Sequence, residues 1–263
     1  MPVVVSGVAR RPRAYVSVSG PDAEDYLQRM VSNDVSGEVC DALLLTPKAR
    51  VIAPLRVWRR GEDDFLLLTE PELGEAVRAT LLRSRFAAKC EIEPEEHTSA
   101  IVFGEAGGIP NPDYGVPAIE VLDDPRDATI GHDELEAMRI VAGTPRFGRE
   151  IDERVLPAEA GLVERAVSFT KGCYPGQEPI ARLHYRGHAN RGLRVLALDG
   201  GELPGYDAPV VFEGKDVGRV TSAVRDGDRV VALGYVRAEV PPDAELAVGD
   251  AIARPVDSVP PRP

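Results

Sequence analysis

Residues Lys171 to Glu178 read Lys-Gly-Cys-Tyr-Pro-Gly-Gln-Glu, and they have no apolar period of a helix or strand. Proline and glycine occupy the central positions of the tetrapeptide 174–177, which predicts a type II turn because its third position needs a positive φ. Cys173 is therefore expected at the mouth of a rigid loop. Lys171 would place a cation near its sulfur and favour the thiolate, so we predict that Cys173 and Lys171 form a functional pair.

The segment that follows this loop, Ala181 to His188, alternates basic and other side chains. Read as an extended strand, it places Arg182, His184, Arg186 and His188 on one face. Residues 171–194 hold five cations and one anion, whereas the whole chain has a net charge of −12. A local cationic patch on an acidic protein is typical of a site for a small polyanion. The alternative is a solvated strand face whose basic side chains only cover apolar surface.

The same motif carries a resemblance to a known family. Together with Arg146-Phe147-Gly148, the run 156–162 and the run 167–170, it resembles the YgfZ family of folate-binding proteins. That family is related to the T-protein of the glycine cleavage system, an aminomethyltransferase that uses tetrahydrofolate. The resemblance implies tetrahydrofolate as cofactor and a role in assembly or repair of iron–sulfur enzymes, including enzymes that modify tRNA.

The resemblance also implies site residues. Glu120 lies in a strand context like that of the T-protein glutamate that binds the pteridine ring, and a carboxylate can accept two parallel hydrogen bonds from a pterin. Arg182 and Arg186 would hold the glutamate tail of folate, and Cys173 would lie at the pocket edge. The remaining residues that we expect at the folate site are Asn33, Asp34, Gln177 and Glu178. For Asn33 and Asp34 the simpler interpretation is a turn that ends a helix.

One position departs from the aminomethyltransferase pattern. Those enzymes carry an acidic residue in the strand that resembles residues 49–55, whereas this chain has Ala53-Pro54. Neither side chain can hold a proton or a charge, so we predict folate binding without aminomethyl transfer. Two alternatives stay open: a folate-dependent one-carbon transferase in which Cys173 or Glu178 replaces the acid, and a scaffold that docks client proteins through the Cys173 loop.

Composition limits the remaining possibilities. The three cysteines, Cys40, Cys90 and Cys173, are widely spaced, so we expect no disulfide framework and no metal site within the chain, and Cys40 and Cys90 as small buried residues. The acidic net charge argues against general nucleic-acid binding. The sequence shows no membrane span and no secretory signal, which predicts a cytoplasmic protein. The expected partners are folate and client iron–sulfur enzymes, and the expected state is a monomer.

The apolar patterns predict an α+β fold. Residues 1–190 should form an α/β region of two associated subdomains that enclose a folate pocket, and residues 191–254 an antiparallel β-barrel. Residues 255–263 should be an extended or disordered proline-rich tail. The proline-rich composition without periodicity that predicts it is already present from Arg254 onward. The predicted strands are 14–19, 42–45, 51–58, 65–68, 99–103, 118–122, 193–198, 209–212, 216–224, 230–236 and 246–252. The predicted helices run from Pro21 to about Ser32, from Pro71, and from His132 to Val141.

Overall fold

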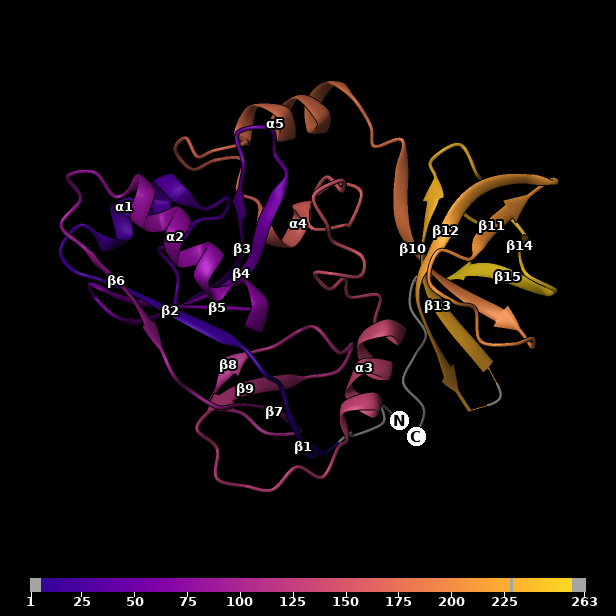
Figure 1. The fold of residues 1–263 in the computed structure, drawn as a ribbon, viewed down its shortest axis with the longest axis horizontal. Helices are drawn as coiled ribbons and strands as arrows, with labels where there is room; N and C mark the ends of the chain where they lie inside the picture. The colour runs from indigo at the N-terminus through magenta and orange to yellow at the C-terminus, as the bar shows by residue number, and fades with distance from the viewer. Residues whose placement is uncertain (1–5, 228, 257–263) are drawn as a thin grey trace.

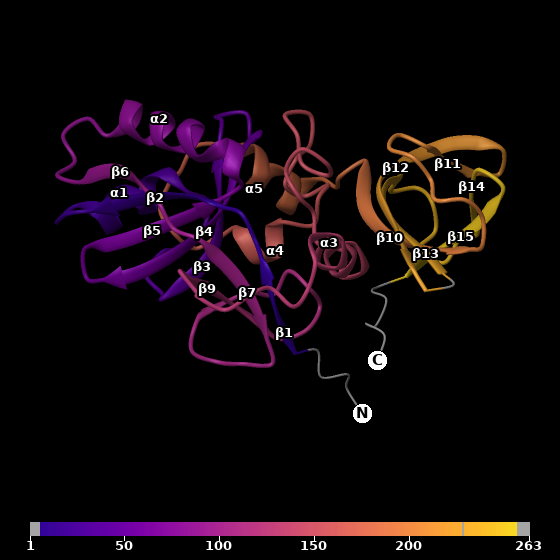
Figure 2. The same ribbon diagram turned by 60° about the horizontal axis from the view of Figure 1, so that its bottom comes forward.

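The structure is a computed structural model that describes residues 6–227 and 229–256, and it confirms the α+β fold class. Two antiparallel sheets with their helices form one side of the molecule, and a closed six-stranded barrel forms the other, as both views show (Figures 1 and 2). Within the described residues no helix has the length and apolar character needed to cross a membrane.

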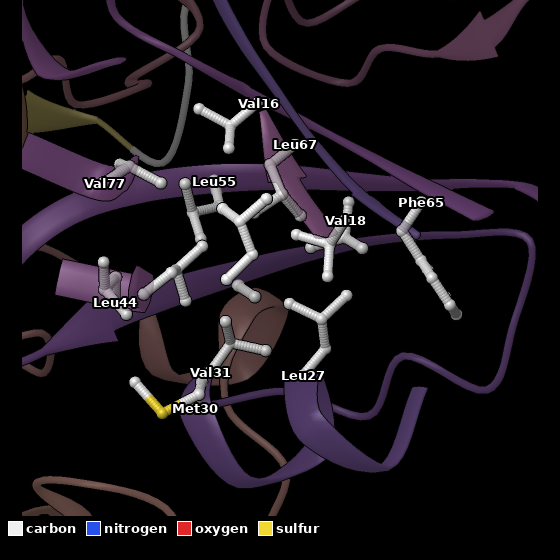
Figure 3. Close-up of a cluster of buried hydrophobic side chains, with 14 of the residues drawn as sticks. Val16, Val18, Leu27, Met30, Val31, Leu44, Leu55, Phe65, Leu67 and Val77 are labelled. Carbon is white, nitrogen blue, oxygen red and sulfur yellow. The ribbon is translucent and has the colours of Figure 1, made fainter. Parts of the chain in front are cut away.

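The larger sheet has five strands in the order β3-β4-β5-β2-β6. Its strands are β2 (Ala14–Ser19), β3 (Val39–Leu45), β4 (Val51–Gly61), β5 (Asp64–Thr69) and β6 (Glu91–Glu95). One face is covered by α1 (Ala23–Met30) and α2 (Gly74–Ser84), with the short helix η1 (Pro71–Leu73) before α2. Figure 3 shows the core between them, where Leu27 of α1 and Val77 of α2 meet alternate strand residues such as Leu55. Because successive side chains of a strand point to opposite faces, the other face of the sheet is not covered by α1 and α2.

The smaller sheet has the order β1-β7-β9-β8. Its strands are β1 (Gly7–Arg10), β7 (Ser99–Phe103), β8 (Ile109–Pro110) and β9 (Ala118–Leu122), and α3 (His132–Val141) packs through Leu135 against it. The predicted segments 14–19, 99–103, 118–122 and 132–141 match the observed elements residue for residue.

The barrel closes in the order β10-β13-β12-β11-β14-β15 around a core of small and branched residues. Its strands are β10 (Arg191–Asp199), β11 (Pro209–Phe212), β12 (Lys215–Asp226), β13 (Arg229–Arg237), β14 (Leu246–Val248) and β15 (Ala251–Val256). The single strand predicted for 246–252 is two strands of a hairpin, because Gly249 turns the chain with φ 58°. The proline-rich tail was also predicted to start too early, since Arg254 to Val256 pair with β10. Residues 257–263 lie outside the described residues.

The largest error concerns the segment after the Cys173 loop. Residues 177–186 form a helix, α5 (Gln177–Arg186), and the short helix α4 (Val163–Ala166) precedes it. Ile180 and Leu183 are buried and half-buried one helical turn apart, so the segment does have a helical apolar stripe. Alternating basic residues imitated the period of a strand, and Pro179, which is tolerated in the first turn of a helix, was not recognised as such. Arg182, His184, Arg186 and His188 therefore do not form one continuous strip.

Candidate functional site

The face of the large sheet that the helices leave free borders a central pocket. It lies between β3 to β5, the loop before β9, α3 and α4. Apolar side chains, among them Leu43, Leu55, Tyr114 and Leu162, form much of its walls. The charged lining residues are Arg11, Arg13, Asp41, Arg56, Glu70, Asp113, Glu136, Arg139, Arg146 and Arg165. Apolar wall residues combined with convergent polar groups are typical of a small-molecule site, although the charged residues are numerous in this pocket.

Two arginines and two aspartates form a closed network on one wall of this pocket. Asp41 of β3 accepts hydrogen bonds from Arg56 Nε at 3.0 Å and from Arg165 Nη2 at 2.6 Å. Asp113, in the loop before β9, accepts from Arg165 Nη2 at 2.7 Å and from Arg56 Nη2 at 3.4 Å. Since β3, β4, α4 and the β9 loop each contribute one member, the network joins the two subdomains at the pocket.

Two pocket carboxylates, Asp113 and Glu136, are held as anions by neighbouring arginines. Burial alone would raise the pKa of Asp113, but Arg56 and Arg165 outweigh it and lower that pKa to about 2. The pKa of Glu136 is also lowered: burial would raise it, and hydrogen bonds from Arg139 reverse the direction. Carboxyl groups that stay ionised at neutral pH have no proton to donate, so Asp113 and Glu136 are unsuited to act as general acids.

A second charged network connects the pocket to the barrel. Arg139 of α3 binds Glu136 and, at 3.0 Å, the fully buried Glu150. Glu150 accepts a hydrogen bond from Ser222 of β12 at 2.6 Å, and its main-chain carbonyl accepts one from Tyr235 of β13 at 2.8 Å. The barrel therefore holds the helix that provides one wall of the pocket.

One pocket donor lacks a hydrogen-bond partner within the chain. Arg56 is only 4% exposed, and its Nη1 atom makes no hydrogen bond among the described residues; the nearest carboxylate oxygen, Oε2 of Glu120, is 3.6 Å away. In the described part of the chain, Asp113 Oδ2 accepts a single long contact, at 3.4 Å from Arg56 Nη2. A buried donor without a partner is costly, so a ligand that offers a hydrogen-bond acceptor would satisfy Arg56. A pterin ring has both acceptors and donors on its edge, so the residues present fit a folate.

Glu120 lies beside the pocket and is occupied by contacts within the chain. Its side chain is fully buried in β9, and it accepts two hydrogen bonds from Arg13, at 3.0 and 3.1 Å. Ser99 and Asn111 donate one hydrogen bond each, at 2.6 and 3.1 Å. These four donors use both carboxylate oxygens, and Glu120 is not among the residues that line the pocket. Because the carboxylate of Glu120 neutralises a buried arginine, this geometry does not support the predicted pterin contact.

The position without an acid lies where the family resemblance suggested. Pro54 of β4 lines the central pocket, while Ala53 points to the opposite face and is fully buried in the core. The main-chain carbonyl of Pro54 accepts a hydrogen bond from Thr69. At this point the pocket wall provides only the apolar ring of proline.

Lys171 anchors the loop 171–176 to the residues that follow α1. Lys171 Nζ donates hydrogen bonds to the carbonyls of Val31 and Asn33, at 2.8 and 2.7 Å, and not to Cys173. Burial lowers the pKa of Lys171 to about 8, although Asp34 acts in the opposite direction. The predicted role of Lys171 as partner of the Cys173 thiol is therefore not supported by this geometry, and its role is structural.

Asn33 and Asp34 form the predicted turn. Asp34 Oδ1 accepts a hydrogen bond from the main-chain nitrogen of Ser36, and Asn33 Nδ2 donates to the carbonyls of Asp41 and Arg165. Neither residue lines the central pocket. Asn33 nevertheless joins the main chain of Asp41 to that of Arg165, two members of the charged network on the pocket wall.

The cysteines differ in exposure. Cys173 is exposed and Cys90 is buried, as predicted, while Cys40 is half-buried. Burial raises the pKa of the Cys40 thiol to about 12 and also raises that of Cys90. Cys173 does not line the central pocket, so the prediction that it lies at the pocket edge is not supported. Within the described residues no group of three or more metal-ligating side chains occurs.

The other predicted folate ligands lie on α5. Glu178, Arg182 and Arg186 are exposed and Gln177 is half-buried, and none of them lines the central pocket. Arg182 and Arg186 border a separate groove instead. The residues that do form the charged wall, above all Arg56, Asp113 and Arg165, carry no local signal in the sequence, since they come together only through contacts between distant segments. A clue for Arg165 was its position within the region of strongest family resemblance.

Comparison with known proteins agrees with this architecture. The glycine cleavage system aminomethyltransferase T from Bartonella henselae superimposes with a TM-score of 0.82 over 94% of this chain and 83% of its own, at 21% sequence identity. The chain therefore has the aminomethyltransferase fold. No family model matches the sequence.

Sequence relatives define the family within this fold. The tRNA-modifying protein YgfZ of Escherichia coli O157:H7 is 26% identical over 90% of this chain and 87% of its own length. The protein of the same name from Cronobacter sakazakii is 28% identical over 73% of this chain and 70% of its own length. An uncharacterized protein of Haemophilus influenzae is 28% identical over 70% of both chains. The chain is therefore similar in sequence to the YgfZ proteins, and it shares its fold with an aminomethyltransferase.

Proposed function

We propose that this protein binds a tetrahydrofolate in its central pocket and acts as an accessory protein in tRNA modification rather than as an aminomethyltransferase. The observation that carries the proposal is Arg56, a residue that lines the pocket and whose buried Nη1 atom has no hydrogen-bond partner among the described residues. The pterin ring offers a carbonyl acceptor for this donor. Asp113, whose Oδ2 has one long contact at 3.4 Å from Arg56, is the carboxylate that would accept hydrogen bonds from the pterin nitrogens in place of Glu120.

The absence of transfer chemistry is part of the proposal. Pro54 occupies the wall where the related enzymes place an acid, and Asp113 and Glu136 are held as anions by arginines. A one-carbon transferase needs a group that can exchange a proton at the reacting nitrogen. Glu178 and Cys173, the two suggested replacements, do not line the pocket, so the transferase alternative has less support.

The similarity to tRNA-modifying protein YgfZ supports the link to tRNA modification. Assembly or repair of iron–sulfur enzymes is the finer part of the proposal and is supported by the family resemblance of the motif around Cys173. A cell that lacks this protein should therefore lose one or more modified tRNA nucleosides. Complementation with the Cys173→Ser variant should fail to restore them, although this exposed residue leaves the fold intact.

The folate proposal is tested by calorimetric titration with tetrahydrofolate and with its 5-formyl derivative. We expect binding of one folate per chain and no transfer from an aminomethyl donor. Asp113→Asn should weaken binding by about ten- to a hundredfold, because a hydrogen bond to a charged group is lost. Glu159→Gln is the matched control, since Glu159 is also a partly buried carboxylate paired with an arginine, Arg191, but lies outside the pocket.

Two results would overturn this function. If neither folate binds to the wild-type protein, the scaffold alternative, which needs no small molecule, becomes the better interpretation. If folate binds but Asp113→Asn and Glu159→Gln behave alike, the ligand does not occupy the central pocket. Turnover of an aminomethyl donor would restore the transferase alternative.

A further inference from the structure

A second hollow lies on the outside of the molecule, between α5 and the segment that precedes α4. Its walls are apolar and come from both sides: Leu156, Pro157 and Val163 on one, Pro179, Ile180 and Leu183 on the other. Ala49, at the turn between β3 and β4, lies at its floor, and α5 crosses this turn at the edge of the molecule (Figure 1). None of these residues lines the central pocket, so the groove is a separate feature.

Two arginines stand at the border of this groove. Arg182 and Arg186 are four residues apart on α5, so they project from the same side of the helix. Both are exposed, and within residues 6–227 and 229–256 neither guanidinium forms an ion pair or a hydrogen bond. Most arginines of this chain are paired with carboxylates; Arg11, Arg60, Arg126 and Arg254 are examples. The side chains of Arg182 and Arg186 are therefore available to pair with carboxylates of a partner in a protein whose net charge is −12.

We propose that this groove docks an acidic amphipathic segment of a partner protein. Its apolar side chains would enter between Leu156 and Leu183, and its carboxylates would pair with Arg182 and Arg186. Charge complementarity identifies the partner, because an acidic segment is attracted to the two cations while the rest of this acidic surface repels it. The apolar walls favour a peptide over a polynucleotide, whose phosphates would need cations along the whole path.

This inference goes beyond the folate pocket and does not depend on it. It gives the accessory role a contact surface and a partner chemistry. The groove and the pocket share no lining residue, so a variant of one should leave the other intact. Failure of the docking proposal and failure of the folate proposal are therefore distinguishable.

The test is selection of a phage-displayed pool of random dodecapeptides on the wild-type protein without folate. Enriched peptides should combine Asp or Glu with Leu, Ile or Phe. A fluorescent synthetic copy of the best peptide should bind the double variant Arg182→Glu/Arg186→Glu at least about tenfold more weakly than wild type, since two attractive charges become repulsive. The control variant is Arg83→Glu, which reverses an exposed arginine of α2 outside the groove and should keep wild-type affinity.

Further measurements separate the remaining outcomes. Leu183→Asp should abolish peptide binding by placing a charge in the apolar wall, while Arg182→Glu/Arg186→Glu should titrate with tetrahydrofolate as the wild type does. The proposal is overturned if no peptide is enriched, if the enriched peptides lack acidic residues, or if the double variant binds them unchanged. It is also overturned if oligouridylate displaces the peptide, because the groove would then be a nucleic-acid site.

Discussion

The carbonyl oxygen of Thr46 lies where a side chain at Gly176 would begin: a Cβ at residue 176 would be 2.7 Å from it. Gly176 also has φ 84°, the left-handed value that the predicted type II turn requires. The turn of the Cys173 loop is thus packed directly against the turn between β3 and β4, next to two strands that line the pocket. Glycine is needed here for both the backbone angle and the contact.

The first prediction follows from this contact. Gly176→Ala should destabilise the protein by about 2–4 kcal/mol, since the left-handed backbone and the displaced Thr46 carbonyl each contribute a cost. Gly172→Ala is the control in the same loop, because no atom lies within 4 Å of its Cβ position and its φ is not in the left-handed region. Urea denaturation measures both. Equal stability of the two variants would contradict the proposed packing.

The second prediction concerns the buried ion pair of Glu120 and Arg13. Glu120→Gln removes the anion that neutralises Arg13, whose side chain is 8% exposed, and should cost about 3–5 kcal/mol. Glu159→Gln should cost at most about 1 kcal/mol, because its partner Arg191 is 32% exposed and water screens the pair. The comparison uses the free energy of unfolding from urea titrations. A similarly small loss for both variants would mean that the buried pair makes no special contribution.

Much of the fold was predictable because the signals are local. The strand Ala14–Ser19 and the helix His132–Val141 show their periods within a few residues, and turn residues separate the barrel strands. The helix α5 was missed because its basic residues alternate and imitate a strand. The helix is favoured because Ile180 is buried in one apolar cluster with residues of β3, β4 and the turn between them, which are far away in the sequence.

The site was less predictable than the fold. Glu120 has the sequence context of a ligand, but its environment is set by Arg13, more than a hundred residues away in the chain. The same is true of Asp41 and Arg165, which meet across 124 positions. The motif loop was correctly identified as a specific feature. Its contacts with Val31, Asn33 and Thr46 show that it also has a structural function that the motif alone did not reveal.

The third prediction concerns pH. His97 bridges Asp123, at 2.7 Å from Nδ1, and Glu95, at 2.9 Å from Nε2, and these hydrogen bonds raise the pKa of His97 in the folded state. The stabilisation is therefore complete below the unfolded-state pKa of about 6.5 and is lost as the pH rises through the higher folded-state pKa.

Unfolding measured over this range should show wild-type stability falling as the pH rises above about 6.5. In His97→Gln this decline should be smaller, while the exposed His188→Gln should follow the wild type. A decline that is unchanged in His97→Gln would assign it to another group.

The fourth prediction concerns the thiols. Cys173 is the exposed cysteine, whereas burial raises the pKa of Cys40 to about 12 and raises that of the buried Cys90. Only the thiolate is alkylated, so the raised pKa values disfavour Cys40 and Cys90, while exposure favours Cys173. Limited treatment with iodoacetamide, followed by peptide mass mapping, should label Cys173 first. Tetrahydrofolate should not protect it, because Cys173 does not line the central pocket.

The matched control for the alkylation is the Cys173→Ser variant, in which native protein should remain almost unlabelled until urea exposes Cys40 and Cys90. Labelling led by Cys40 in the native protein would show that the β3 edge opens readily and that exposure in the folded state does not determine reactivity. Protection of Cys173 by folate would instead require the loop 171–176 to respond to the pocket. Lys171 would be the first residue to examine, because its ammonium holds the loop to the carbonyls of Val31 and Asn33.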